Sequence, residues 1–155
     1  MDTIQLPSAF SDILRLLNAH EVRYLVIGGF AVAYHGYPRA TGDIDIWIDP
    51  EQGNAARVHA SVVELGFDLP SLRVSDFSNP DRVVRLGYPP MRIEFMTRIP
   101  GVMFADCFGR RVVADFNGVE TSLIGLACLR ANKVATGRSK DLNDLEHLPE
   151  STHGL

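Results

Sequence analysis

Long apolar runs are missing from this sequence. No stretch of apolar residues approaches the ~18 residues that a membrane-spanning helix needs, so we expect no transmembrane helix. The N-terminal segment, MDTIQLPSAFSD, has neither a basic start nor the apolar stretch of a secretory signal peptide. We therefore expect no signal peptide either.

Cysteine is scarce. The two cysteines, Cys107 and Cys128, lie in apolar surroundings and lack the paired spacing of a metal or redox motif. We predict that both are buried free thiols, rather than a disulfide or a metal site. Free thiols fit a reducing compartment, so we expect a cytoplasmic protein.

An excess of positive charge is also missing. The net charge is −4 and the pI is about 5.7, which argues against a protein that coats DNA or other nucleic acids. Local arginine clusters are still compatible with RNA binding. With 46% apolar and 22% charged residues, the composition predicts one globular domain over 1–155, with a core over about 8–148 and a frayed tail from 149.

The most informative stretch is YLVIGGFAVAYHGYPRATGDIDIWID, residues 24–49. Its first four residues form an apolar run typical of a buried strand. Gly28 and Gly29 follow, where backbone can approach a ligand without a Cβ in the way. Residues 30–35 then favour a short helix, and 43–48 alternate acidic and apolar residues as a half-buried strand does.

Two carboxylates of this second strand share one face. Side chains two positions apart in a strand point the same way, so Asp43 and Asp45 lie together. Their mutual repulsion favours a hard divalent cation between them, Mg²⁺ or Mn²⁺, whose remaining ligands are commonly phosphate oxygens. Backbone N–H groups after the glycine pair suit a phosphate. The alternative for each piece alone is an ordinary turn and a solvated strand face.

Gly28-Gly29 and Asp43-x-Asp45, in this order and separated by a helix, resemble the signature of the DNA polymerase β-like nucleotidyltransferase superfamily. The resemblance implies an α+β (α/β) nucleotidyltransferase fold, with a mixed β-sheet and helices packed around it. It also implies a nucleoside triphosphate (NTP) as substrate and a third carboxylate on a later strand. Glu94, an acid within the strand sequence MRIEFMT, is the best candidate for that third metal ligand and catalytic residue.

Periodicity and turn signals predict further elements along the chain. Residues 67–79 are predicted to be an irregular loop over the site, with a helical turn near 75–78. Asn117-Gly118 between apolar runs is a strong hairpin signal. The predicted helices are 7–20, 51–65, 104–108, one capped by Thr121 or Ser122 and running to about 136, and 140–148. The predicted strands are 82–86, 91–97, 110–116 and 119–123.

The late segment LRANKVATGRSKDLNDLEHL resembles that of compact bacterial relatives of the nucleotidyltransferase toxins of abortive-infection, type IV toxin–antitoxin systems. The resemblance implies that Lys133 contacts the triphosphate, with Asp141 as its positioning partner and Asp144 in a lesser role. It also implies an antitoxin as a partner. Without it, these residues fit a solvated helix face with local ion pairs.

Arg39 and Thr41 connect the glycine-led helix to the acidic strand. We include both among the nucleotide-binding candidates. Arg39 is close enough in sequence to reach a bound phosphate, or to form a salt bridge with Asp43 or Asp45.

Glu94 departs from that toxin-related group, in which the equivalent acid is usually Asp. Its extra methylene moves the carboxylate by roughly an ångström, a displacement that can be costly in an active site. Two functions follow. The first is metal-dependent transfer of a nucleoside monophosphate to an RNA end, a protein or a small molecule, and it includes a toxin-like role as one alternative. The second is a nucleotide-binding module that has lost turnover.

Overall fold

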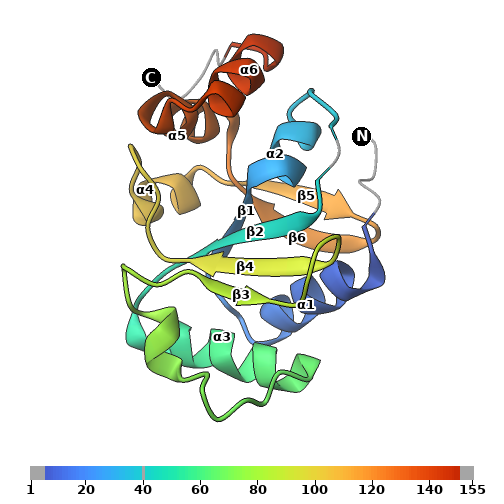
Figure 1. Cartoon of the computed structure of the whole chain (residues 1–155), viewed down its shortest axis with the longest axis vertical. Helices are drawn as coiled ribbons and strands as arrows, with labels where there is room; N and C mark the ends of the chain where they lie inside the picture. Colours follow the sequence, from blue (N-terminus) through green and yellow to red (C-terminus); the bar gives the residue numbers. More distant parts are fainter. Residues whose placement is uncertain (1–5, 40, 151–155) are drawn as a thin grey trace.

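The computed structural model describes residues 6–39 and 41–150, and within them one mixed sheet carries helices on both faces (Figure 1). The six strands lie in the order β3-β4-β2-β1-β6-β5. The strands are β1 Tyr24–Ile27, β2 Asp43–Ile48, β3 Val84–Leu86, β4 Arg92–Met96, β5 Val112–Phe116 and β6 Val119–Leu123. The helices are α1 Ser8–Ala19, α2 Gly28–Tyr34, α3 Gln52–Leu65, η1 Val74–Phe77, α4 Phe104–Gly109, α5 Leu126–Thr136 and α6 Ser139–His147. The predicted α+β class is confirmed.

Strand β1 lies inside the sheet, and its sequence Tyr-Leu-Val-Ile is buried throughout. It pairs antiparallel with β2 and parallel with β6, while β2 pairs parallel with β4. The chain leaves β1 through α2 and returns antiparallel as β2. The glycine pair at the end of β1 and the first acid at the start of β2 therefore lie at the same end of these two strands. This connection brings together residues that are 14 positions apart, Gly29 and Asp43.

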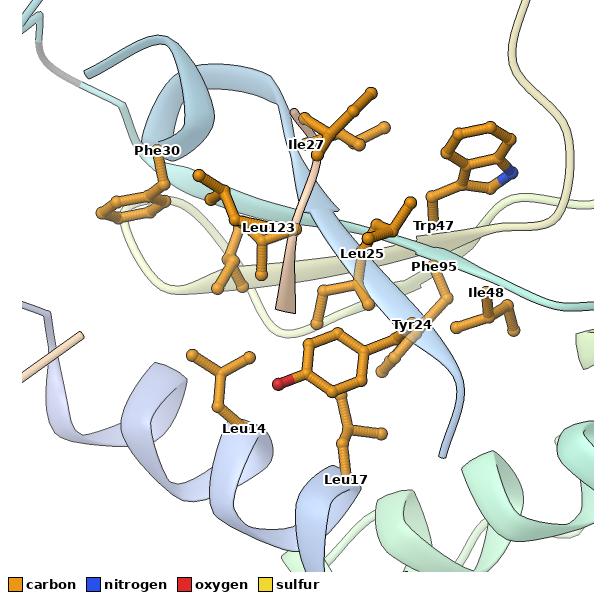
Figure 2. Close-up of a cluster of buried hydrophobic side chains, with 14 of the residues drawn as sticks. Leu14, Leu17, Tyr24, Leu25, Ile27, Phe30, Trp47, Ile48, Phe95 and Leu123 are labelled. Atoms are coloured by element: carbon orange, nitrogen blue, oxygen red, sulfur yellow. The ribbon is translucent and has the colours of Figure 1, made fainter. Parts of the chain in front are cut away.

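The apolar core lies on both faces of this sheet. Helices α1 and α3 pack against each other on one face, and α2, α5 and α6 lie on the other (Figure 1). Figure 2 shows the side chains around β1, where Leu14 and Leu17 of α1 approach Tyr24 and Leu25. These α1 residues recur at helical spacing, which is why one stripe of α1 is buried. No helix among the described residues is long and apolar enough to cross a membrane.

Most predicted boundaries agree with the structure within a few residues, and three details differ. Helix α2 begins at Gly28, so the glycine pair forms its first turn rather than a turn before it. Thr121 and Ser122 do not cap α5, because they pair with β5 as part of β6 and Gly125 precedes the helix. The segment around η1 packs against α3, not over the acidic site, because Phe77 is buried against Phe95 on that face. Of the predicted tail, 149–155, residues 151–155 lie outside the described residues.

The prediction of two free thiols is wrong. Cys107 of α4 and Cys128 of α5 are paired in a disulfide, with their Cα atoms 6.0 Å apart. The packing of α4 beside the start of α5 brings together two residues that are 21 positions apart, and the sequence spacing carries no sign of it. The pairing removes the support that free thiols lent to a reducing compartment.

Candidate active site

Three carboxylates meet on the face of the sheet that lies below α5 and α6. Asp43 and Asp45 come from β2, and Glu94 comes from β4, where it lies opposite Asp45 in the parallel register. One oxygen from each carboxylate lies within 4.8 Å of those from the other two. The residues that alternate with these acids lie on the opposite face of the sheet and are buried there, namely Ile44, Ile46, Ile93 and Phe95. The predicted grouping of Glu94 with the Asp-x-Asp pair is therefore present in the structure.

The glycine pair makes room for neighbouring side chains. Gly28 has a φ of +71°, and a Cβ there would collide with the carboxylate of Asp45. A Cβ on Gly29 would lie 2.7 Å from Cβ of Thr41. The Thr41 hydroxyl in turn donates to the backbone carbonyl of Asp43 at 3.0 Å. Both glycines thus let the start of α2 approach the acidic strand closely, and Thr41 orients the first residue of that strand.

Crowding changes the acidity of Asp45. Burial is the largest cause, followed by a hydrogen bond with Glu94 and the negative charges of Glu94 and Asp43; together they raise the pKa of Asp45 from 3.8 to about 7. The positive charge of Lys140 acts in the opposite direction. Near neutral pH and without a cation, Asp45 is therefore partly protonated, with its carboxyl group hydrogen-bonded to Glu94.

This raised pKa predicts a pH-dependent stability for the metal-free protein. The folded state holds the proton of Asp45 more tightly than the unfolded state, so the stabilisation is complete below pH 4 and is lost as the pH rises towards 7. Each pKa unit corresponds to about 1.4 kcal/mol, so the loss is up to about 4 kcal/mol. Urea unfolding in chelator at several pH values should show it, and Asp45→Asn should flatten the curve. Parallel curves for the two proteins would contradict the assignment.

Two arginines that were not among the predicted site residues neutralise the acids. Arg92 of β4 donates from Nη2 to Oδ2 of Asp43 at 2.9 Å, and its Nε lies 3.4 Å from Oε2 of Glu94. Arg85 of β3 donates from Nε to the same Glu94 oxygen at 2.8 Å. The i, i+2 spacing of Arg92 and Glu94 on one strand could have revealed the proximity of these two side chains.

A buried ionic network joins α5 and α6 above the acids. Lys133 has its Nζ 2.9 Å from Oδ2 of Asp144 and 3.3 Å from Oδ1 of Asp141. Lys133 is only 4% exposed, and each aspartate is 1% exposed. Arg138 holds Asp141 through Nε at 2.7 Å, and Arg39 holds Asp144 through two hydrogen bonds of 3.0 Å. Asp144 is therefore as central to this network as Asp141, and more so than the sequence indicated.

The two aspartates of the network are charged. Burial by itself would raise the pKa of Asp141, but the hydrogen bond from Arg138 and the charge of Lys133 outweigh it and lower the pKa. The same balance, with hydrogen bonds from Lys133 and Arg39, lowers the pKa of Asp144. Arg39 forms its salt bridge with Asp144, not with Asp43 or Asp45, and so ties the segment before β2 to α6.

One cavity of about 380 Å³ brings the candidates together. Its lining includes all nine residues predicted for the site: Gly28, Gly29, Arg39, Thr41, Asp43, Asp45, Glu94, Lys133 and Asp141. Three further cations line it, namely Arg98, Arg138 and Lys140. Lys140 is exposed and has no ion pair within 6–39 and 41–150. The cavity thus has an acidic floor on the sheet and a cationic wall on α5 and α6.

Comparison with known proteins supports the fold. No family model and no curated protein matches the chain. Among solved structures, the chain is similar to the crystal structure of a "putative nucleotidyltransferase" from Thermotoga maritima, with a TM-score of 0.64 and 20% identity. The match covers 90% of this chain and 89% of the other. At this identity the likeness shows the fold alone, and we conclude that the chain has a nucleotidyltransferase fold.

Proposed function

We propose that this protein is a metal-dependent nucleotidyltransferase, which moves a nucleoside monophosphate from an NTP to a hydroxyl acceptor. The observation that carries the proposal is the group Asp43, Asp45 and Glu94, whose oxygens lie within 4.8 Å of one another in a cavity with a cationic wall. The nucleotidyltransferase fold is a second support. A metal between the acids and a triphosphate along Arg138 and Lys140 would use both the acidic floor and the cationic wall of the cavity.

The acidic group suits a hard divalent ion such as Mg²⁺ or Mn²⁺. Three carboxylates from two neighbouring strands form an all-oxygen donor set, which is the set these ions prefer. Oδ1 of Asp43 is buried and has no hydrogen-bond partner among the described residues, so it is available as a ligand. Asp45 would exchange its proton for the ion.

The transfer needs one bond made and one broken at the α-phosphorus. The acceptor oxygen bonds to phosphorus as the bond to the bridging oxygen of pyrophosphate breaks, and the hydroxyl proton passes to Glu94 or Asp45. A bound divalent ion would hold phosphate oxygens and offset the charge that develops on them. Arg138 and Lys140 present exposed cationic side chains to the departing pyrophosphate. Lys133 and Asp141 are buried and paired with each other. Their role is to hold Arg138 in position, because Asp141 also accepts a hydrogen bond from Arg138.

A second candidate is a nucleotide-binding module without turnover. The observation that favours it is the environment of Glu94, whose Oε2 is held by Arg85 at 2.8 Å and lies 3.4 Å from Arg92. A carboxylate occupied in this way is a poor ligand and a poor base until it is released. Nucleotide binding without product would favour this candidate.

Label transfer distinguishes the two. The purified protein is incubated with each α-labelled NTP, with Mg²⁺ or Mn²⁺, and with total RNA or a protein extract. We expect label on one macromolecule class with the wild type. With Asp43→Asn/Asp45→Asn we expect at least a roughly thousandfold loss, because the metal supplies several kcal/mol of charge stabilisation. Equal labelling by both proteins would contradict the proposed site.

The class of acceptor that takes up label decides the finer proposals. Label on RNA ends would extend the proposal to a toxin-like role with a partner antitoxin, as the resemblance to the type IV toxins implies. Label on protein or on a small molecule would point to another acceptor. Metal-dependent nucleotide binding without any label would leave the binding module as the function.

A further inference from the structure

The acidic face of the sheet carries its own counter-ions. Arg92 lies opposite Asp43 in the register of β2 and β4, and Arg85 lies opposite Glu94 in the register of β3 and β4. Each arginine therefore meets an acid on the neighbouring strand, where side chains of opposite charge attract. Two guanidinium groups thus face three carboxylates and offset most of their negative charge in the metal-free protein.

We propose that Arg92 is an internal counter-ion of the metal site, which a divalent ion must displace in order to bind. This inference rests on the proposed function. Arg92 donates to Oδ2 of Asp43 at 2.9 Å and reaches Glu94 at 3.4 Å, so it touches two of the three candidate ligands. A divalent ion between these carboxylates would lie within a few ångströms of the guanidinium, where two positive charges repel strongly.

Arg92 is better placed for this role than Arg85. Its side chain is 31% exposed, whereas that of Arg85 is 56% exposed, so its charge is screened less by water. Within the described part of the chain, Arg85 forms an ion pair with Glu94 alone. Arg92 also leaves Oδ1 of Asp43 without a hydrogen-bond partner while it holds Oδ2. One oxygen of Asp43 is thus open to a metal, and the other is taken by the arginine.

The displaced arginine has a natural second partner. A guanidinium group forms paired hydrogen bonds with phosphate as readily as with carboxylate. When metal and triphosphate arrive together, the phosphates can take over the guanidinium that the metal has expelled. A metal ion that binds without a triphosphate must displace Arg92 from the carboxylates, and no phosphate is then present to pair with the guanidinium group. The site therefore binds metal weakly by itself and more strongly with a triphosphate.

The test measures Mn²⁺ binding to the whole chain without nucleotide, from the electron paramagnetic resonance signal of free Mn²⁺. Arg92→Gln keeps a hydrogen-bonding side chain but removes the charge, and we expect its Mn²⁺ dissociation constant to fall about tenfold. Arg92→Lys keeps the charge and should bind as the wild type does. Arg98→Gln is the matched control, because Arg98 lines the same cavity but pairs with Asp81, outside the acidic group. It should stay within about twofold of the wild type.

Each outcome decides the question. Unchanged or weaker binding by Arg92→Gln would overturn the counter-ion role, as would an equal gain in Arg98→Gln, which would indicate a general charge effect. If no protein binds Mn²⁺, with or without inorganic tripolyphosphate, the proposed function itself fails together with the inference. Near-ultraviolet circular dichroism of the single, buried Trp47 reports folding. If Arg92→Gln does not fold, Arg85→Gln replaces it, with an expected gain of about threefold.

Discussion

Replacing Lys133 with methionine is expected to reduce the free energy of unfolding by about 3–5 kcal/mol, the usual cost of removing one partner from a buried ion pair. The lysine Nζ lies 2.9 Å from Asp144 and 3.3 Å from Asp141. Both aspartates are almost fully buried. Methionine fills a similar volume, so the loss comes from the charge and not from a cavity.

The remaining partners of the aspartates do not replace the lysine. Arg39 and Arg138 reach the two carboxylates from the edge of the network, and the side chain of Arg138 is 63% exposed. Without Lys133 between them, the two buried carboxylates repel each other. We therefore expect the pKa of at least one of them to rise in Lys133→Met, and its stability to recover partly at acid pH.

Lys140→Met is the matched control for stability. It removes the same charge with the same substitution from α6, but Lys140 is exposed, so its free energy of unfolding should change by no more than about 0.5 kcal/mol. Urea unfolding of the wild type and both variants makes the comparison. A small effect of Lys133→Met, similar to that of the control, would show that the lysine is not held by the two aspartates. The role predicted from the sequence, direct contact between Lys133 and the triphosphate, would then be favoured.

Replacing Gly28 with alanine is expected to weaken Mn²⁺ binding and label transfer by about a hundredfold or more, because a displacement near an ångström at a reacting centre has that effect. The new Cβ would collide with the carboxylate of Asp45. That carboxylate lies within 4.8 Å of Asp43 and Glu94 and cannot retreat without leaving the group. The helix that starts at Gly28 leads directly from β1, so the backbone has little freedom to move instead.

Gly118→Ala separates this effect from backbone strain. Gly118 has a φ of +84°, close to the +71° of Gly28, but a Cβ there would have nothing within 4 Å. Both substitutions carry the strain of a left-handed conformation, roughly 1 kcal/mol, and Gly28→Ala should lower stability further because its Cβ collides with Asp45. Only Gly28→Ala should lose metal binding. Equal metal binding by the two variants would contradict a close approach of Asp45 to Gly28.

The positions of helices and strands were predictable because they depend on local patterns. The alternation Asp-Ile-Asp-Ile places two acids on one face of β2 whatever surrounds it. The Asn117-Gly118 hairpin follows equally from local chemistry, since both residues adopt positive φ. The boundary of α5 was less predictable, because hydroxyl residues that often cap helices also suit a strand, and pairing with β5 decided between the two.

The partners of charged groups were not predictable in the same way. Arg39 had Asp43 and Asp45 nearby in sequence, yet it binds Asp144, 105 positions away. The packing of α6 beside the segment before β2 brings a buried carboxylate within reach, and a carboxylate buried in this way gains more from a charged partner than an exposed one does. Cys107 and Cys128 pair for the same reason, since α4 and α5 meet.

The sequence alone determined which elements form and which side chains share a face, because backbone periodicity is a local property of the chain. Through its resemblance to a known superfamily, it also indicated that the glycine pair, the two acids of β2 and Glu94 form one candidate group. Only the tertiary structure decided that Lys133 is buried between two aspartates and that Arg92 holds the acids. Ion pairs between distant segments depend on distances and burial, and these arise only when helices and strands pack together.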